Sequence, residues 1–588
     1  MNNVLRGVVA AVEEEGERLR AEFHRADGPR GRRGSAPIDT EIEQRLLAKL
    51  KALLPCAFAG EETGTTPCAD ASHPEWLWLV DPHDGTYEFL QGRRGSAISV
   101  ALLKKAVPVL GVVSSPLAPD RGRDTIAWAE GMHGILRNGS LIEVDLSKRR
   151  LAPGELVWTT ASAALRPETY ARAAEPARFV AMPSIAYRLA RVAAGDGAAA
   201  ITVHEVNEYD IAAGMALIRA AGGVLLDLQG REIALAADPE VRVNGCFAGG
   251  REAALHLSRF NWGALEEEPR REPRVNLGFP RKTDEGRLAR AIGCLLGQVI
   301  GDSLGSRVEF KGAAEIAAEF PQGVRDLADG GVYHTLAGQP TDDSEMALTL
   351  SRSLIKNRAY AKDAVLAAYR EWLQTRPVDV GATTERGLLG MHTTESESNG
   401  SLMRVSPIGI WAAGEPQRAA RAAREDSALT HPNIACIESC AGFSAAIAAG
   451  VGGADRRAML EAALANSTGP ARAAIERGAS GTPPTEYEKR MGWVLVSLQN
   501  AFYQLLHSES FEAALVATVG KGGDTDTNAA IAGALLGAAH GREAIPARWV
   551  LPVLACRPMA EAGALRPRPT ECWPDDVLDV AEALLNLQ

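Results

Sequence analysis

Acidic residues next to Gly and Thr mark the places in this 588-residue sequence where chemistry could occur. The segment WLWLVDPHDGTYEF, residues 76–89, ends an apolar run with Asp81 and Asp84, which can face one hard cation. Gly85 and Thr86 are expected to open a helix, whose free N–H groups suit an anion. A divalent cation beside a phosphate site is what phosphoester hydrolysis requires, because the metal lowers the pKa of a water and offsets phosphoryl charge. Taken alone, such a turn can equally be a simple helix cap.

Two further acidic segments lie in the second half of the chain. T-D-D-S at residues 341–344 and G-G-D-T-D-T at residues 522–527 each start an Ala- or Leu-rich helix, and GQVIGDSLGSRVEF at residues 297–310 places Glu309 beyond the end of another. Either cluster alone is an ordinary N-cap. Together they supply hard oxygen ligands from two helix ends, which suit a pair of Mg²⁺ or Mn²⁺ ions.

The sequence around these segments changes texture once, which predicts two domains. Before about residue 260, apolar strand-like runs alternate with amphipathic helices, and after about residue 288 the 3.6-residue spacing predicts an all-α half. The expected strands are 76–80, 97–103, 107–113 and 223–228. The expected helices are 42–54, 289–300, 344–355, 362–373, 436–449, 493–506, 528–539 and 576–586. We therefore expect a mixed α/β domain at 1–262, an exposed, Pro- and charge-rich linker at 263–286, and a helical domain at 287–588.

Composition excludes several classes of function. With 46% hydrophobic and 23% charged residues, most of the chain should fold. A formal net charge of −11 argues against a general nucleic-acid or anionic-membrane binder, although a small anionic ligand is still allowed. The longest uncharged run, 491–508, carries polar side chains and is expected to be a buried helix, so no membrane span is needed.

Eight cysteines without a C-x-x-C pair, and an N-terminal segment that turns acidic, predict the reducing cytoplasm. His431, Cys436 and Cys440 could indicate a metal, but a fourth ligand at zinc spacing is missing, which favours buried thiols. The basic stretch 24–34 could close over a phosphorylated ligand, although a solvated loop is the simpler interpretation. Its arginines are Arg25, Arg30, Arg32 and Arg33.

Three motifs in the first domain, taken in order, resemble those of the inositol monophosphatase superfamily of metal-dependent phosphatases. They are G-E-E at 60–62, D-P-x-D-G-T at 81–86, and N-E-Y-D at 207–210 with the trailing A-G-G-x-x-x-D. The resemblance covers roughly residues 1–260. It implies an α/β layered sugar-phosphatase fold and direct attack of water on phosphorus.

The same resemblance implies the site residues. The implied Mg²⁺ ligands are Glu61, Asp81, Asp84, Asp210 and the carbonyl of His83. Thr86 and Glu61 would hold the attacking water, and the amides of Gly85 and Thr86 would hold phosphate. Asp39 matches a further family carboxylate that supports another metal ion and pairs with the threonine.

Some residues bear on the substrate. DGTYEF and PVLGVVSSP, residues 108–116, are closer to the 3'(2'),5'-bisphosphate nucleotidase branch than to inositol phosphatases, which favours a nucleotide-like phosphate. Four residues depart from the family pattern: Ala36 replaces Thr, His83 replaces Leu or Ile, Tyr87 replaces Lys or Thr, and Tyr209 replaces Trp. Because the main carboxylates remain, these changes affect the expected substrate more than the chemistry.

Four motifs in the second domain resemble the ADP-ribosylglycohydrolase family, all-α enzymes with a binuclear metal centre. They are G-D-x-x-G-x-x-x-E ending at Glu309, T-D-D-S, N-G-x-x-M-R starting at Asn399, and G-G-D-T-D-T. The implied metal ligands are Thr341, Asp342, Asp343, Asp524, Asp526 and Thr527. The residues implied to line the ADP-ribose pocket are Asn399, Gly400, Ser401, Met403, Arg404 and His431. Glu309, by the reacting ribose, and Asp343 are the implied catalytic carboxylates, and Ser398 stands where the family often has Gly.

We therefore expect a cytoplasmic bifunctional hydrolase with two or more Mg²⁺ or Mn²⁺ ions in each domain. The second domain would hydrolyse the ribose C1'' bond of small-molecule or protein-linked ADP-ribose, and the first a nucleotide-like or ADP-ribose-derived phosphomonoester. Two alternatives stay open: only the glycohydrolase half is catalytic and the other half is a recognition module, or the chain is a non-enzymatic ADP-ribose reader.

Overall fold

The computed structural model describes residues 1–587 except 33, 68–72, 239–240, 280 and 282–283, so Arg33 of the basic stretch lies outside the described residues. The chain forms two compact units. Unit 1 comprises Met1–Pro273 and Leu277–Lys282, and unit 2 comprises Arg274–Asn276 and Thr283–Gln588.

Unit 1 contains two sheets and the helices that cover them. The helices are α1 (Asn2–Phe23), α2 (Pro37–Leu53), α3 (Thr86–Leu90), α4 (Pro167–Ala174), α5 (Ile185–Ala193), α6 (Glu208–Ala220), α7 (Arg251–Ser258), α8 (Ala264–Glu267), and the 3₁₀ turns η1 (Leu146–Lys148) and η2 (Ala161–Leu165). The first sheet contains β1 (Ala57–Gly60), β2 (Gly64–Thr66), β3 (Trp76–Asp84), β4 (Ala97–Lys104), β5 (Val107–Ala118), β6 (Gly122–Ala129), β7 (Ile135–Arg137) and β8 (Ser140–Ile142), in the order β2-β1-β3-β4-β5-β6-β7-β8. The second sheet contains β9 (Leu156–Thr159), β10 (Arg178–Ala181), β11 (Ala199–Asn207), β12 (Val224–Leu226) and β13 (Arg242–Gly249), in the order β10-β9-β11-β13-β12.

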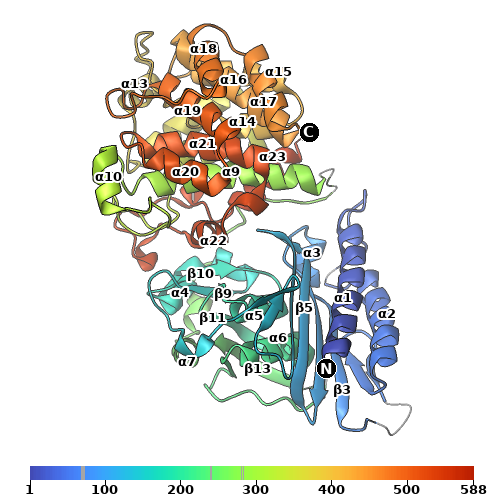
Figure 1. Cartoon of the computed structure of the whole chain (residues 1–588). Coiled ribbons are helices and arrows are strands. Elements are labelled where there is room, and N and C mark those ends of the chain that lie inside the picture. The colour runs from blue at the N-terminus through green and yellow to red at the C-terminus, as the bar shows by residue number, and fades with distance from the viewer. Residues whose placement is uncertain (33, 68–72, 239–240, 280, 282–283, 588) are drawn as a thin grey trace. The chain divides into compact units, whose positions relative to one another are not determined.

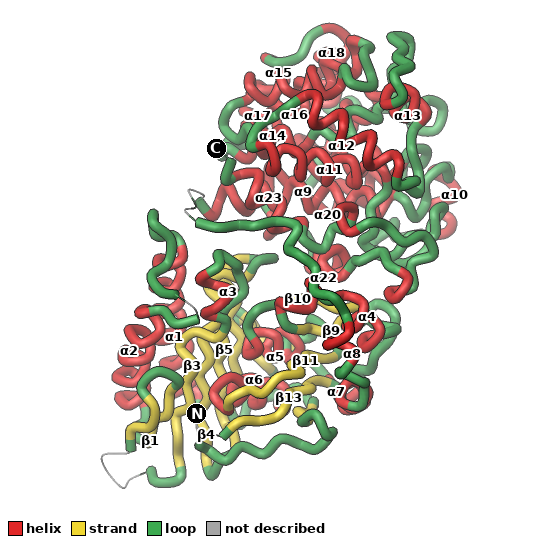
Figure 2. Tube along the Cα trace, turned by 180° about the vertical axis from the view of Figure 1, so that it is seen from behind, coloured by secondary structure: helices red, strands yellow, loops and turns green. Residues whose placement is uncertain are grey.

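These elements are stacked in layers (Figures 1 and 2). Helices α1 and α2 pack on the first sheet, α5 and α6 contact strands of both sheets, and α4 and α7 pack on the second sheet. Strands β4 and β5 are buried along almost their whole length, which explains why their sequences are continuous apolar runs. The layered α/β fold expected from the sequence is confirmed.

An irregularity in β3 places the first acidic motif. The pairing of β3 with β4 changes register between Asp81 and Asp84. In a regular strand, residues three apart point to opposite faces of the sheet, whereas a bulge re-aims the side chains that follow it. Gly85 then takes a left-handed φ of 97°, which favours glycine, and α3 begins at Thr86.

Unit 2 is helical throughout the part of it that the structure describes, apart from isolated bridges and loops, and this confirms the all-α expectation. Its helices are α9 (Glu285–Gly305), α10 (Ala313–Glu319), α11 (Asp342–Asn357), α12 (Lys362–Gln374), α13 (Ala382–Leu388), α14 (Ser406–Trp411), α15 (Pro416–Ser427), α16 (Ile434–Val451), α17 (Arg456–Ala465), α18 (Gly469–Ala479), α19 (Val494–His507), α20 (Phe511–Val519), α21 (Thr525–His540), α22 (Ala547–Ala555), α23 (Val577–Leu585), and the 3₁₀ turns η3 (Arg542–Ala544), η4 (Ala560–Ala562) and η5 (Thr570–Cys572).

Glycines of α9 let α21 lie directly against it. A Cβ at Gly297 would lie 2.4 Å from the carbonyl oxygen of Gly533, and one at Gly301 would lie 2.1 Å from that of Ala529. Neither distance is tolerated without movement of a helix. The close approach brings the end of α9 next to the start of α21, where two of the acidic motifs lie.

Among the described helices, α16 alone is long and apolar enough to cross a membrane by length and composition. In the structure, 89% of its 18-residue window is buried inside the fold, as is typical of a core helix. The uncharged run at 491–508 forms α19, whose residues are also mostly buried.

The segment predicted as an exposed linker, 263–286, is partly anchored. Glu268, just after α8, accepts hydrogen bonds from two backbone amides at the start of α4, at 3.0 and 2.8 Å. The guanidinium of Arg274 forms an ion pair with Asp575 in unit 2. The sequence alone does not indicate these contacts, because the partners of Glu268 and Arg274 lie about 100 and 300 residues away in the chain.

Candidate active sites

The carboxylates predicted in unit 1 lie where β1, β3 and α6 begin or end. Asp81 is buried, Asp84 and Asp210 are partly buried, and Glu61, just after β1, is exposed. Protein donors orient one oxygen of three of them. Asp81 Oδ1 accepts a hydrogen bond from the amide of His83 at 2.8 Å. Asp84 Oδ2 accepts one from the hydroxyl of Ser184 at 2.6 Å. Asp210 Oδ2 accepts one from the amide of Asn207 at 2.8 Å.

Burial and mutual repulsion raise the pKa values in this group. For Asp81 the main cause is burial, followed by repulsion from Glu61, Asp84 and Asp210, and its pKa lies well above the usual range. Desolvation inside the site, and then the neighbouring carboxylates, also raise the pKa values of Glu61 and Asp210, whereas burial is the cause that raises the pKa of Asp84. Carboxylates that cannot all be ionised together in one site are suited to a divalent cation, which removes their repulsion.

Thr86 lies beside this group. Its hydroxyl is 2.8 Å from the carbonyl oxygen of His83 and 3.2 Å from Asp39 Oδ2, so either oxygen can accept its hydrogen. Asp39 is also a cap of α2, because Oδ2 accepts the amide of Ala36 at 3.2 Å. The His83 carbonyl that the family resemblance assigns to a metal is therefore shared with Thr86.

Glu43 is a positioning residue that the motifs do not mark. It is fully buried, and its carboxylate accepts the amides of Glu62 and Thr63 at 2.9 and 2.6 Å, which fixes the loop after Glu61. The available sequence signal was its spacing, since Glu43 lies four residues after Asp39 and thus on the same face of α2.

The basic stretch at 24–34 folds back on its own helices. Arg30 forms ion pairs with Glu22 and Glu41, at 2.8 and 2.9 Å. Arg25 lies 3.5 Å from Glu22. The charges of these two arginines are therefore partly met within the fold.

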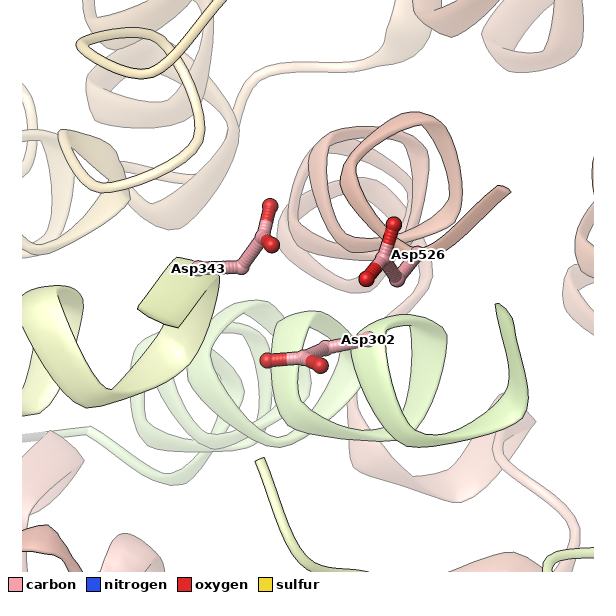
Figure 3. A group of neighbouring side chains, drawn as sticks. All are labelled: Asp302, Asp343 and Asp526. Atoms are coloured by element: carbon pink, nitrogen blue, oxygen red, sulfur yellow. The ribbon is translucent and has the colours of Figure 1, made fainter. Parts of the chain in front are cut away.

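Three aspartates from three helices point toward one another in unit 2 (Figure 3). Asp302 comes from α9, Asp343 from the first turn of α11 and Asp526 from the first turn of α21, and their ligand oxygens lie within 4.8 Å of one another. Glu309, Asp524 and Asp526 form a second group, whose carboxylate oxygens also lie within 4.8 Å of one another. Asp526 belongs to both groups, so the geometry offers two neighbouring cation positions.

The donor set of unit 2 fits hard cations. Glu309 Oε2 and Asp343 Oδ1 are buried and have no hydrogen-bond partner among the residues that the structure describes. Burial, and then the neighbouring carboxylates, raise the pKa of Glu309 to about 8 and hold that of Asp526 well above its usual range. Buried, unpartnered carboxylate oxygens are the ligands that Mg²⁺ and Mn²⁺ prefer.

Asp302 was not assigned from the sequence, although it lies inside the quoted G-D-x-x-G motif. Its carboxylate accepts the amide and hydroxyl of Thr341, at 3.0 and 2.9 Å, and the amide of Ser344 at 3.0 Å. It therefore holds the T-D-D-S turn against α9. Burial raises the pKa of Asp302 to about 6.

The other predicted ligands lie at the same helix starts. The hydroxyl of Thr341 also lies 3.2 Å from Asp343 Oδ2, so either aspartate can accept its hydrogen, and the amide of Thr527 donates to Asp526 Oδ1 at 2.9 Å. Asp342 Oδ2 accepts the amide of Gly381 at 3.3 Å.

Tyr333 and Asp379 border the cluster without belonging to a motif. Burial, followed by the Glu309 and Asp379 carboxylates, raises the pKa of Tyr333. Both residues lie in loops, where the helical pattern of the sequence carries no signal.

The predicted pocket residues separate into two groups. The side-chain amide of Asn399 donates to Asp524 Oδ2 at 2.7 Å, so it reaches the carboxylate cluster. Ser401 and Arg404, expected to line the pocket, are fully buried beside α15, where Ser401 contacts Ser427 and Arg404 pairs with Asp426 at 2.9 Å. A buried guanidinium requires a carboxylate partner, and Asp426 provides it.

His431 is a hydrogen-bonded, buried histidine next to this motif. Its Nε2 lies 2.9 Å from the hydroxyl of Ser398, and a Cβ at Gly400 would lie 3.2 Å from its ring. Burial and the nearby Arg404 lower the pKa of His431 to about 3, so the ring is neutral. Met403 is also buried.

The nearby thiols are bonded within the protein. Cys436 and Cys440 contact the carbonyl of Ser398 and the hydroxyl of Ser401, at 3.2 and 3.4 Å. Both are buried, as the simpler interpretation of these thiols expects.

Known proteins resemble the two units separately. Residues 283–585 match the ADP-ribosylglycohydrolase family, and residues 3–259 match the inositol monophosphatase family. An ADP-ribosyl-[dinitrogen reductase] glycohydrolase of Rhodospirillum rubrum is 31% identical over 273 residues, which cover 44% of this chain and 89% of the relative.

Two relatives match the first unit. A probable inositol 1-monophosphatase ImpA of Mycobacterium tuberculosis is 31% identical over 225 residues, covering 35% of this chain and 77% of the relative. A 3'(2'),5'-bisphosphate nucleotidase CysQ of Aggregatibacter actinomycetemcomitans is 29% identical over 246 residues, covering 38% and 85%. The chain therefore belongs to the inositol monophosphatase family through its first unit and to the ADP-ribosylglycohydrolase family through its second.

Proposed function

We propose that this protein is a bifunctional, metal-dependent hydrolase. Unit 2 hydrolyses the ribose C1'' bond of ADP-ribosylated substrates, and unit 1 hydrolyses a nucleotide-like or ADP-ribose-derived phosphomonoester. The observation that carries the proposal is the gathering of carboxylates in each unit, above all the two groups that share Asp526. A cytoplasmic location remains a prediction from the cysteine content.

The residues of each unit suggest where Mg²⁺ or Mn²⁺ would be held. In unit 1 these are Glu61, Asp81, Asp84, Asp210 and the His83 carbonyl. In unit 2 they are Thr341, Asp342, Asp343, Asp524, Asp526 and Thr527, with Asp302 added on its geometry. Bound there, such ions would lower the pKa of a water and offset negative charge on the substrate oxygens.

In unit 1, Glu61 and Thr86 hold the attacking water. Thr86 can donate its hydrogen to Asp39 or to the His83 carbonyl, and its oxygen then accepts from the water. Glu61, exposed and with a raised pKa, can take a proton from that water. The likeness to the CysQ nucleotidase and the DGTYEF motif support a nucleotide-like substrate.

In unit 2, Glu309 is the residue that we assign to proton transfer at the anomeric centre. Its pKa of about 8 lets it hold or release a proton near neutral pH, which suits a general acid or base. Asn399 orients Asp524 through its side-chain amide.

A substrate screen tests the proposed function. Purified full-length protein is incubated with ADP-ribosyl-arginine, ADP-ribosyl-serine, adenosine 3',5'-bisphosphate and inositol 1-phosphate, each with Mg²⁺ and with EDTA. We expect Mg²⁺-dependent release of ADP-ribose and of phosphate. Binding of ADP-ribose without any turnover would favour the reader, and release of ADP-ribose alone would favour a recognition role for unit 1.

Because relatives of unit 2 are named for ADP-ribosylated substrates and one relative of unit 1 is named for a nucleotide phosphate, we propose that the two units act in sequence on one compound. A substrate that carries both an ADP-ribosyl bond and a phosphomonoester should release phosphate and ADP-ribose. Release of only one product from every such compound would contradict the sequence of steps.

A further inference from the structure

His83 occupies a position where the phosphatase family usually has Leu or Ile, and its side chain is fully buried. Its Nδ1 lies 2.6 Å from Asp39 Oδ1, and its Nε2 lies 3.2 Å from the hydroxyl of Ser96. The ring also packs edge-on against Phe89, with the centroids 4.4 Å apart. Three contacts on three sides therefore fix the imidazole.

The partner determines the direction of the shorter hydrogen bond. A carboxylate oxygen accepts, so Nδ1 carries a hydrogen and donates it to Asp39. On the opposite side of the ring, Nε2 lies 3.2 Å from the hydroxyl of Ser96. The imidazole is therefore held between Ser96 and Asp39.

The hydrogen bond from His83 fixes the orientation of the Asp39 carboxylate. With Oδ1 held by His83, Oδ2 is turned toward Thr86, 3.2 Å away, and the amide of Ala36, also 3.2 Å away. Among the described residues, the other acceptor within hydrogen-bond distance of the Thr86 hydroxyl is the carbonyl of His83, at 2.8 Å. The carbonyl of His83 is therefore free of this hydrogen bond only when Asp39 accepts the hydroxyl hydrogen of Thr86 instead.

We propose that His83 is a positioning residue of the phosphatase site, whose imidazole holds Asp39 as the hydrogen-bond acceptor of Thr86. The proposal rests on the phosphatase activity proposed for unit 1. His83 does not touch the reacting atoms through its ring, so its substitution changes the rate constant of the chemical step more than the binding of substrate.

Kinetics of the full-length protein test this role. With adenosine 3',5'-bisphosphate at saturating Mg²⁺, His83→Leu is expected to lower kcat by about 10- to 100-fold with little change in KM, as for other residues that orient a functional group. His83→Asn can donate to Asp39 from nearly the same place as Nδ1, so it should recover most of kcat.

Near-ultraviolet circular dichroism of the same samples, compared with that of the wild type, reports whether the variants are folded. A kcat for His83→Leu equal to that of the wild type would overturn the proposal. An equal loss in His83→Leu and in His83→Asn would also overturn it, since the donor would then be irrelevant.

A spectroscopic measurement separates this proposal from the phosphatase activity itself. In full-length protein labelled with ¹⁵N-histidine, the Nδ1–H of His83 should give a protected proton resonance far downfield, which is absent in His83→Asn and moves upfield in Asp39→Asn. If the wild type releases no phosphate but shows this resonance, the phosphatase activity fails and the His83–Asp39 contact stands. If the resonance is missing, or is unchanged in Asp39→Asn, the positioning role is wrong.

Discussion

Asp526 is the residue on which the two carboxylate groups of unit 2 meet. Its carboxylate lies within 4.8 Å of those of Asp302 and Asp343, and also within 4.8 Å of those of Glu309 and Asp524. Loss of the Asp526 carboxylate would affect both proposed cation positions, whereas loss of Asp302 or of Asp524 would affect only one. Asp526 is therefore the most informative residue to substitute in unit 2.

Asp302 offers a test of the hydrogen bonds around this cluster. Asp302→Asn should lower glycohydrolase turnover by about 10- to 100-fold, because a side-chain NH₂ would face donors that now bind a carboxylate. Turnover is measured during a Mg²⁺ titration, with Asp363→Asn on the exposed start of α12 as the control. A rate and a Mg²⁺ midpoint equal to those of the wild type would contradict the role of Asp302.

The residues that the sequence could not assign share one property. Asp302 and Glu43 act by accepting hydrogen bonds from the backbone of other motifs, and this role becomes visible only when the helices are placed. The ion pair of Arg404 with Asp426, 22 residues later, is likewise not indicated by its motif. Asp81 differs, because the residue types and spacing of its own motif are enough to indicate a cation site before the fold is known.

At the scale of elements, two local features bring the acidic residues together. A register shift in β3 separates Asp81 from Asp84, and the small residues of α9 let α21 approach closely. The helical spacing of the sequence predicted both helices but not their contact. Close packing of two helices depends on both surfaces, and one periodic pattern describes only one of them.

Gly301 tests the importance of this contact. Gly301→Ala would place a Cβ 2.1 Å from the carbonyl of Ala529, so α21 must move. We expect a loss of about 1–3 kcal/mol in the free energy of unfolding, together with weaker Mn²⁺ binding, as measured by denaturant unfolding and by titration.

Gly286→Ala, in the first turn of α9, is the matched control. The nearest atom to its Cβ is a side-chain oxygen of Asp284 at 3.2 Å, so stability and Mn²⁺ binding should stay close to those of the wild type. The role assigned to α9–α21 packing fails if the two variants behave alike.

At the scale of the whole molecule, composition and spacing predicted two folds of different class. In the second sheet of unit 1, β9 and β10 were missed because each is only four residues long. The run 223–228, expected as a strand, is one over Val224–Leu226. Short strands lack the length in which a period of two can be recognised.

The raised pKa values predict how stability depends on pH and metal. Glu309 has a pKa of about 8 and Asp302 one of about 6, both above the values of unfolded carboxylates. The folded state then binds more protons than the unfolded state, so without metal its stability should fall as pH rises from about 5 to about 8. Bound Mg²⁺ should reduce this fall, because the ion takes the place of the protons.

Scanning calorimetry in EDTA and in Mg²⁺ measures this effect. The Tm of the glycohydrolase unit in EDTA should decrease over that pH range, and less steeply in Glu309→Gln, whose side chain does not titrate. A Tm that rises with pH in EDTA and is insensitive to Glu309→Gln would show that the cluster is not protonated in the folded state.

We propose that one chain contains two separate hydrolytic sites. The sharpest test is to measure both activities in three proteins. Release of phosphate from adenosine 3',5'-bisphosphate and of ADP-ribose from ADP-ribosyl-arginine or ADP-ribosyl-serine is followed in the wild type, Asp81→Asn and Asp526→Asn. We expect Asp81→Asn to lose at least about 100-fold in phosphate release alone, and Asp526→Asn to lose at least about 100-fold in ADP-ribose release alone. Full retention of both activities in both variants, or loss of both activities in either folded variant, would contradict it.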